Sequence, residues 1–220
     1  MDHLLVLNVA MTLCAAVSFI CGAIKYFKPR KPLYATMIVC GVGCIMFGRS
    51  YQCVRLLTGY PVTEDFQVGI LGIVGAFSFF LSANYGQMDS LVDDGSKAFG
   101  KYRAVGWLGT LLIGVLYVIF LRSEVSAGGK IVCGIVTMII GLACYFHSKH
   151  LLIYDVDYGV IRCLRYYNAL AFLYGILCMF EMIALGYQKD VLLIAVSIFM
   201  CAVSALIIPA MDRGVQKWKT

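Results

Sequence analysis

The stretch from Leu33 to Leu57, LYATMIVCGVGCIMFGRSYQCVRLL, decides the fold class of this chain. It is longer than the ~20 apolar residues that an α-helix needs to cross ~30 Å of hydrocarbon. Its only ionised side chains are Arg49 and Arg55. Because lipid cannot hydrogen-bond to an open backbone, and because the stretch lacks the alternation of a barrel strand, it predicts a transmembrane helix.

Six further apolar stretches also predict transmembrane helices. One of them, Ile131–Phe146, is short but can be extended by Leu151–Tyr154. The complete set is Leu4–Ile24, Leu33–Leu57, Phe66–Tyr85, Ala104–Leu121, Ile131–Phe146, Tyr166–Gly186 and Val191–Met211.

The composition of the chain agrees with membrane insertion. Hydrophobic residues make up 61% of the 220 residues and charged residues 14%, against ~45–50% and ~25% in soluble domains. The sequence therefore predicts an all-α polytopic membrane protein, a bundle of seven transmembrane helices that forms one domain over residues 1–220. The N-terminal Met1-Asp2-His3 lacks the basic region of a secretory signal, so we expect the first helix to be retained.

Basic residues between the apolar stretches predict the orientation. Thirteen lie on one side of the predicted membrane, and few lie in the loops of the other side. The positive-inside rule places the basic side in the cytoplasm, which puts the N-terminus outside and the C-terminus in the cytoplasm. Short loops and the lack of a targeting peptide lead us to expect a prokaryotic plasma membrane. The thirteen are Lys25, Lys28, Arg30, Lys31, Lys97, Lys101, Arg103, Lys149, Arg162, Arg165, Arg213, Lys217 and Lys219.

Two opposite charges lie at matching depth inside predicted helices. Arg49 is about 24 Å along its helix from Leu33, and Glu181 about 22 Å along its helix from Tyr166, at ~1.5 Å per residue. An isolated charge at the centre of a membrane helix costs ~2.5–3.5 kcal/mol on insertion scales, so each charge needs a partner. We therefore expect Arg49 and Glu181 to pair inside the bundle or to contact a common ligand.

Other polar residues lie near this level. Gln52, Arg55 and Tyr51 share a helix with Arg49, and Asn8 lies in the first helix. Arg49, Gln52, Arg55, Glu181, Tyr51 and Asn8 are the predicted ligand-binding residues, and two arginines would favour a ligand with a carboxylate or phosphate. The alternative is a structural salt bridge, with Arg55 extending to the membrane interface.

Two further groups of residues suggest metal or enzyme chemistry. His147 and His150 share a helix face, and the nearby Asp155 and Asp157 could complete a zinc site, although the spacing matches no metalloprotease motif. The Asp155-x-Asp157-x-Gly159 run resembles only part of a calcium loop. We read this region as a solvated helix end.

Asp89, Asp93 and Asp94 are acidic residues on the predicted cytoplasmic side, where basic residues predominate. Aspartates at this level hold metal in membrane phosphotransferases, but here Asp94-Gly95 is followed by Ser96-Lys97-Ala98-Phe99, which departs from that family's pattern. Pairing with nearby basic residues is the alternative. No general base or nucleophile lies alongside, so we assign no catalytic residue.

Cysteines and small residues are assigned to packing. The chain has ten cysteines and no C-x-x-C motif, so they are expected to act as small buried hydrophobes, and we predict no metal and no cofactor. Gly69, Gly72 and Gly75 in the third stretch, with Gly134 and Gly141 in the fifth, should let helices approach closely.

Three function classes follow from these residues. The first is a receptor-like or sensor-like bundle with an outward polar pocket for a small ligand. It would act through a membrane or cytoplasmic protein partner. The second is a small-solute transporter or channel, for which Ser78, Ser82, Asn84 and Asn168 could extend a polar route. The third is an inner-leaflet enzyme or a structural subunit. We favour the first because Pro209 is the only proline within a helix and the polar cluster lies at one end. We expect no nucleic-acid partner, because no basic arm alternates with aromatic residues.

Overall fold

The computed structural model describes residues 2–59, 68–89, 93–153 and 163–219, and within these ranges the chain is helical and has no strand. Seven of its helices are long and apolar enough to cross a membrane, as the sequence predicts. They are α1 (Asp2–Tyr26), α2 (Leu33–Thr58), α3 (Val68–Ala83), α4 (Gly100–Leu121), α5 (Ala127–Leu152), α7 (Arg165–Gly186) and α8 (Asp190–Lys219). A π-helical turn, Asn84–Met88, continues α3, and a short 3-10 helix, Lys97–Phe99, precedes α4.

Local signals explain where several helices begin and end. Pro32 precedes α2, and Gly59 ends it in the left-handed region with φ 64°, a conformation that glycine adopts without a steric penalty. Ser126 caps α5, since its Oγ accepts a hydrogen bond from the backbone N–H of Gly129 at 3.0 Å. Helix α5 begins before and ends after the apolar stretch Ile131–Phe146 from which the sequence predicts it.

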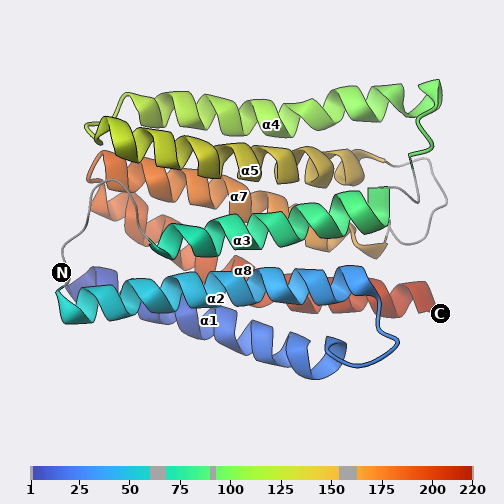
Figure 1. The fold of residues 1–220 in the computed structure, drawn as a ribbon, viewed down its shortest axis with the longest axis horizontal. Helices are drawn as coiled ribbons and strands as arrows, with labels where there is room; N and C mark the ends of the chain where they lie inside the picture. Colours follow the sequence, from blue (N-terminus) through green and yellow to red (C-terminus); the bar gives the residue numbers. More distant parts are fainter. Residues whose placement is uncertain (1, 60–67, 90–92, 154–162, 220) are drawn as a thin grey trace.

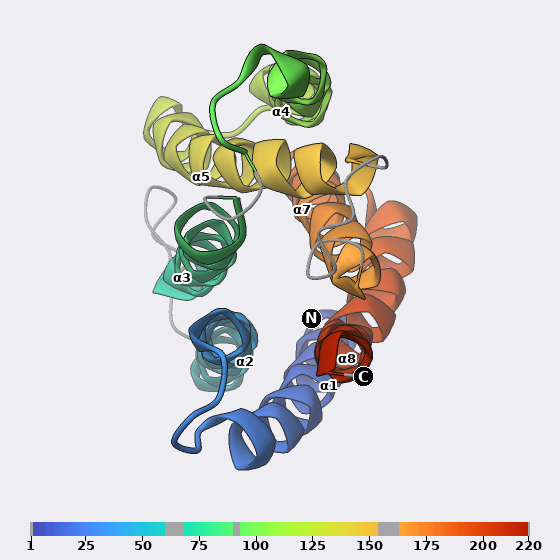
Figure 2. The same cartoon turned by 90° about the vertical axis from the view of Figure 1, so that its right-hand side faces the viewer.

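Six of the helices form a closed ring. Around the ring, α1 contacts α2, α2 contacts α3, α3 contacts α5, α5 contacts α7, α7 contacts α8, and α8 returns to α1. Figure 2 shows this ring in end view, with α4 outside it, packed against α5 and α7. The chain thus leaves the ring after α3 and re-enters it at α5.

The chain termini lie at opposite ends of the bundle (Figure 1). We call the end that holds the N-terminus the N-end and the other the C-end. Large apolar side chains remain exposed along the outside of α1 and α4, for example Val17 at 63% and Leu108 at 61%. Such a surface is disfavoured in water and is suited to lipid.

Helices α2 and α3 approach each other closely. A Cβ placed on Gly72 would lie 2.6 Å from Gly48 Cα, and one placed on Gly48 would lie 2.9 Å from Gly72 Cα. Gly75 and Gly134 also face neighbouring helices, at Cys44 and Tyr117. Close packing through small residues, as predicted, is therefore what these glycines provide.

Replacing Gly72 with leucine should destabilise the protein, because the contact at Gly48 is backbone and cannot rotate away. Overpacking of this kind costs about 1–3 kcal/mol or more. We expect Gly72→Leu to lower the midpoint of thermal unfolding in detergent. Gly114→Leu is the matched control, since a Cβ at Gly114 meets nothing within 4 Å. Equal midpoints for the two variants would contradict the close approach.

Candidate functional site: a polar cavity beside a buried ion pair

Arg49 and Glu181 form a two-point ion pair in the interior of the ring. Arg49 Nη1 donates to Glu181 Oε1 and Nη2 donates to Oε2, each at 2.5 Å. Both residues are 7% exposed. Planar, bidentate contact between guanidinium and carboxylate is among the strongest ion-pair geometries in proteins. The pairing expected from their matching depth is present.

The ion pair connects helices that are not neighbours in the ring. Arg49 extends from α2 to Glu181 on α7, and its Nη2 also lies 3.8 Å from Met200 Sδ on α8. Two charges removed from water require excellent geometry to be tolerated, and loss of one partner leaves the other uncompensated. The pair therefore fixes how α2, α7 and α8 face one another.

A cavity of about 630 Å³ lies beside the ion pair at the N-end of the bundle. Its walls come from α2, α3, α5 and α7 and from Phe120 of α4, together with residues of the α4–α5 and α7–α8 connections. A volume of ~300–1,000 Å³ is typical of small-molecule sites. The residues that line the cavity are Ile45, Gly48, Arg49, Gln52, Gly69, Ile70, Gly72, Ile73, Phe120, Glu124, Val125, Ser126, Gly129, Val132, Cys133, Tyr174, Glu181, Met182, Leu185, Gly186 and Gln188.

Among the described residues that line the cavity, the ionised groups are Arg49, Glu181 and Glu124. At neutral pH one positive and two negative charges give the lining a formal charge of −1. Because Arg49 and Glu181 neutralise each other, the unbalanced charge is that of Glu124, whose residue is exposed. The field in the cavity therefore favours a positive group.

Three of the six predicted ligand-binding residues line the cavity: Arg49, Gln52 and Glu181. Gln52 packs over Gly69, where an added Cβ would lie 2.2 Å from its Nε2. The structure does not bring the other three to the lining. Tyr51 is exposed on the outside of α2, and Asn8 Nδ2 donates to the Leu4 carbonyl of its own helix at 2.9 Å.

Arg55 is the third of these. It is partly buried on α2, and its Nε and Nη1 have no hydrogen-bond partner among the residues that the structure describes. Arg55 and Arg49 are six positions apart, which turns their side chains away from each other on a helix with 3.6 residues per turn. The two arginines therefore do not form one anion site.

Sequence reasoning missed Glu124 and Gln188 as cavity residues. Glu124 lies two residues before Ser126, the residue that caps the start of α5. Gln188 lies in the α7–α8 turn with φ 51°, a left-handed conformation that is uncommon for residues other than glycine. The positions of Glu64 and Asp65 lie outside the described residues.

A layer of aromatic side chains closes the cavity toward the C-end. Tyr174 forms part of the cavity wall, and Phe77 stacks on it with ring centroids 6.3 Å apart. Phe80 follows, edge-on to Phe77 and to Tyr167 at 5.7 and 6.1 Å. All four rings are 0–1% exposed, so a buried aromatic layer lies between the cavity and the polar groups on its other side. Ser82, expected to extend such a route, is exposed on the outside of α3.

Below this layer, three fully buried polar side chains meet. His147 Nδ1 lies 2.8 Å from Asn84 Nδ2 and 2.9 Å from Asn168 Oδ1. A neutral imidazole nitrogen either accepts from the Asn84 amide or donates to the Asn168 carbonyl, so each tautomer makes one of these bonds. Asn84 begins the π-helical turn of α3, a distortion that often marks functional positions.

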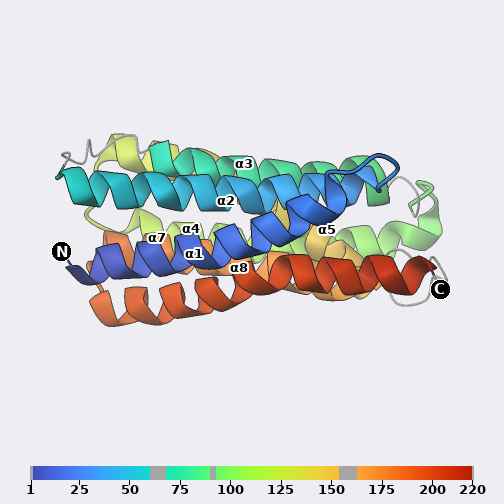
Figure 3. The same cartoon turned by 90° about the horizontal axis from the view of Figure 1, so that it is seen from below.

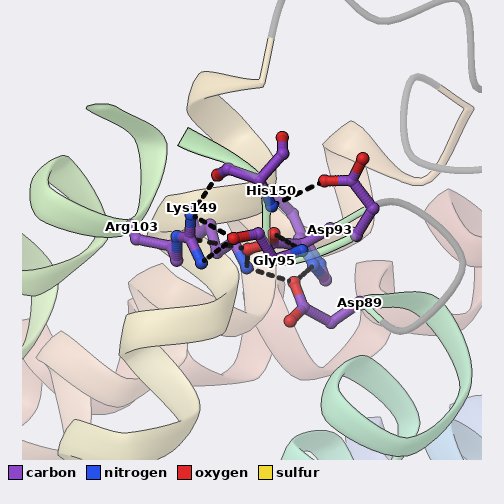
Figure 4. Close-up of polar contacts among 8 residues, drawn as sticks. Asp89, Asp93, Gly95, Arg103, Lys149 and His150 are labelled. Carbon is purple, nitrogen blue, oxygen red and sulfur yellow. Dashed lines mark hydrogen bonds and ion pairs between the residues drawn. The ribbon is translucent and has the colours of Figure 1, made fainter. Parts of the chain in front are cut away.

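A charged cluster lies nearer the C-end, where α3, α4 and α5 meet (Figure 4). Lys149 Nζ lies 2.7 Å from both Asp89 Oδ1 and Asp93 Oδ2, and Lys149 is only 2% exposed. His150 Nε2 lies 3.0 Å from the same oxygen of Asp89. Arg103 approaches Asp93 at 3.7 Å and also donates to the carbonyls of Gly95 and Ser96.

The carboxylates of this cluster are held in the charged form. Burial acts to raise the pKa of Asp89, but hydrogen bonds from His150 and Lys149 outweigh it and hold the pKa below its usual value. For Asp93, burial is likewise outweighed, by Lys149 and the Gly95 N–H. The Ser96 backbone N–H, 2.8 Å from Asp94 Oδ1, lowers the pKa of that exposed carboxyl.

These contacts indicate a structural clamp. Asp89 pairs with Lys149 and His150, and Asp93 pairs with Lys149 and Arg103, as the alternative of pairing with basic residues expects. Asp94 instead accepts a hydrogen bond from the Ser96 backbone N–H. The described residues contain no group of three or more metal-ligand side chains. Asp155, Asp157 and Gly159, which entered the zinc and calcium hypotheses, lie outside the described residues.

Comparison with protein-family models, curated proteins and solved structures finds no match to this chain.

Removing one member of the Arg49–Glu181 pair should destabilise the fold, because the remaining charge stays buried. We expect Arg49→Met and Glu181→Met each to lower the unfolding free energy by about 3–5 kcal/mol, measured by thermal unfolding in detergent. The double variant should recover most of the loss, since no charge is left unpaired. A double variant less stable than either single one would contradict this account.

Lys149 should contribute more than Arg103 to the charged cluster. Lys149→Met leaves two aspartates near a buried site without their closest cation, and we expect a loss of about 3 kcal/mol or more. Arg103 is 35% exposed, so Arg103→Met should cost about 1 kcal/mol or less. Equal shifts in the unfolding midpoint would show that burial does not set these contributions.

Proposed function

We propose that this chain is a receptor-like membrane protein that binds a small ligand bearing an ammonium group in its N-end cavity. The proposed orientation places the N-end outside the cell and the basic C-end in the cytoplasm, following the positive-inside rule. The proposed location is a plasma membrane. A protein partner at the C-end would distinguish the ligand-bound form from the ligand-free form.

The charge of the cavity lining carries this proposal. An anionic ligand was expected on the assumption that Arg55 joined Arg49. Arg55 does not line the cavity, whereas Glu124 does. The surplus carboxylate attracts a positive group, and two aromatic residues of the same lining, Phe120 and Tyr174, are of the type that binds an ammonium by cation–π contact.

The arrangement of the ion pair supports a conformational change when the ligand binds. An ammonium that approaches Glu181 competes with Arg49 for the same carboxylate. Because Arg49 also touches Met200 on α8, its displacement would alter contacts among α2, α7 and α8. This is the kind of differential interaction by which a ligand shifts a conformational equilibrium.

A small-solute transporter is the second candidate. The cavity and the Asn84–His147–Asn168 group lie on opposite sides of the aromatic layer, as expected for a site with alternating access. The closed layer formed by Phe77, Phe80, Tyr167 and Tyr174, together with helices that are continuous apart from Pro209, gives more support to the binding protein.

Thermal-shift measurements on detergent-purified protein test the proposal. Primary amines of several sizes should raise the unfolding midpoint, and carboxylates of the same size should not. Glu124→Gln should weaken the effect of amines by about tenfold in apparent affinity, in line with loss of about 1.4 kcal/mol.

Asp190→Asn is the matched control, because Asp190 is exposed at the same end but does not line the cavity. It should leave the response unchanged. A response to carboxylates alone, or an equal effect of both substitutions, would overturn the ammonium proposal. Uptake of an amine into proteoliposomes would favour the transporter.

A further inference from the structure

A second cavity runs along the outside of the ring, between α1 and α8. It has a volume of about 500 Å³ and is mostly apolar, with Leu13, Val17 and Cys21 on one side and Ile208 and Pro209 on the other. Lys25 and Asp212 line the same groove. Because Cys21 and Val17 are exposed on the outside of α1, the groove opens toward the surrounding lipid.

The sequence of α8 explains why the groove exists. Pro209 has no backbone N–H and therefore leaves the Ala205 carbonyl without its helical donor, which bends a helix. Ala205 also lines the groove. Figure 3 shows α1 inclined to α8, and the two helices remain in contact at the C-end, where Lys25 and Tyr26 reach Asp212.

The length of the groove matches one leaflet of a bilayer. From Leu13 to Lys25 the axis of α1 rises about 18 Å at ~1.5 Å per residue. One leaflet contributes about 15 Å of hydrocarbon to a ~30 Å core. A single acyl chain in extended form therefore fits along the groove, from mid-membrane to the C-end surface.

Charged groups mark the C-end of the groove. Lys25 Nζ lies 2.5 Å from Asp212 Oδ1, and Tyr26 Oη donates to the same carboxylate at 2.5 Å. The Lys25 side chain is 44% exposed, so some of its three N–H donors point away from Asp212. Lys28, Arg30, Lys31 and Arg213 follow in the adjoining segments, and Lys31 adds to the positive potential at Asp212.

We propose that this groove binds an anionic glycerophospholipid of the C-end leaflet, with one acyl chain between α1 and α8 and its phosphate against Lys25 and the neighbouring basic residues. An excess of basic groups beside an apolar groove is complementary to a negative headgroup on a hydrocarbon chain. Basic pockets between transmembrane helices bind anionic headgroups in this way.

Lipid binding to purified protein tests the proposal. Native mass spectrometry and thermal unfolding should both show preference for phosphatidylglycerol over phosphatidylcholine with the same acyl chains. Cys21→Trp fills the groove and should abolish the preference. Leu111→Trp is the matched control, because Leu111 is 61% exposed on α4, away from the groove. This variant should keep the lipid preference of the unmodified chain.

A second variant separates binding from folding. Lys28→Gln combined with Lys31→Gln alters only charges beyond the end of α1 and should weaken phosphatidylglycerol binding by about fivefold per lysine. Equal binding of both lipids, or an unchanged preference in Cys21→Trp and in the double lysine variant, would overturn the proposal. A dimer that Cys21→Trp dissociates, without any lipid preference, would assign the groove to contact between two copies instead.

Discussion

The arrangement of the ring depends on one contact, the two-point ion pair between Arg49 and Glu181. In lipid an unpaired charge is costly, so the helices that carry these residues must face each other across the interior. This requirement fixes the rotation of α2 and α7 about their axes. The same rotation presents Gln52 and Tyr174 to the cavity and turns Tyr51 outward. The pairing of Arg49 with Glu181 thus also determines which side chains line the candidate site.

The two ends of the interior differ in how their charged groups are arranged. At the N-end, side chains leave a volume of about 630 Å³ beside the ion pair. At the C-end, Lys149 is surrounded by carboxylates at 2.7 Å, and the space is filled by the charged groups themselves. An open site with a surplus charge is suited to accept a partner, whereas a closed and neutralised cluster is suited to hold helices together. The aromatic layer separates the two.

The sequence predicted what hydropathy and depth determine. The stretch Tyr166–Gly186 became α7, Arg165–Gly186, and the matching heights of Arg49 and Glu181 anticipated their contact. The order of the helices around the ring was not predictable, since hydropathy does not show which helices are neighbours. The position of α4 outside the ring, the approach of Glu124 to the cavity and the meeting of Asn84 with His147 all depend on that order. Where a loop residue such as Glu124 points is decided by packing of the helices that flank it.

The ring closes through its first and last helices, α1 and α8, and this has a consequence for biosynthesis. Arg49 and Glu181 are 132 positions apart, so the arginine enters the membrane long before its partner exists. At about 5–20 residues per second, the ribosome needs roughly 7 to 26 seconds to supply that partner. During this interval α2 must be sheltered by the insertion machinery, by water or by lipid phosphates. The interior is therefore completed only after α7 and α8 have been synthesised.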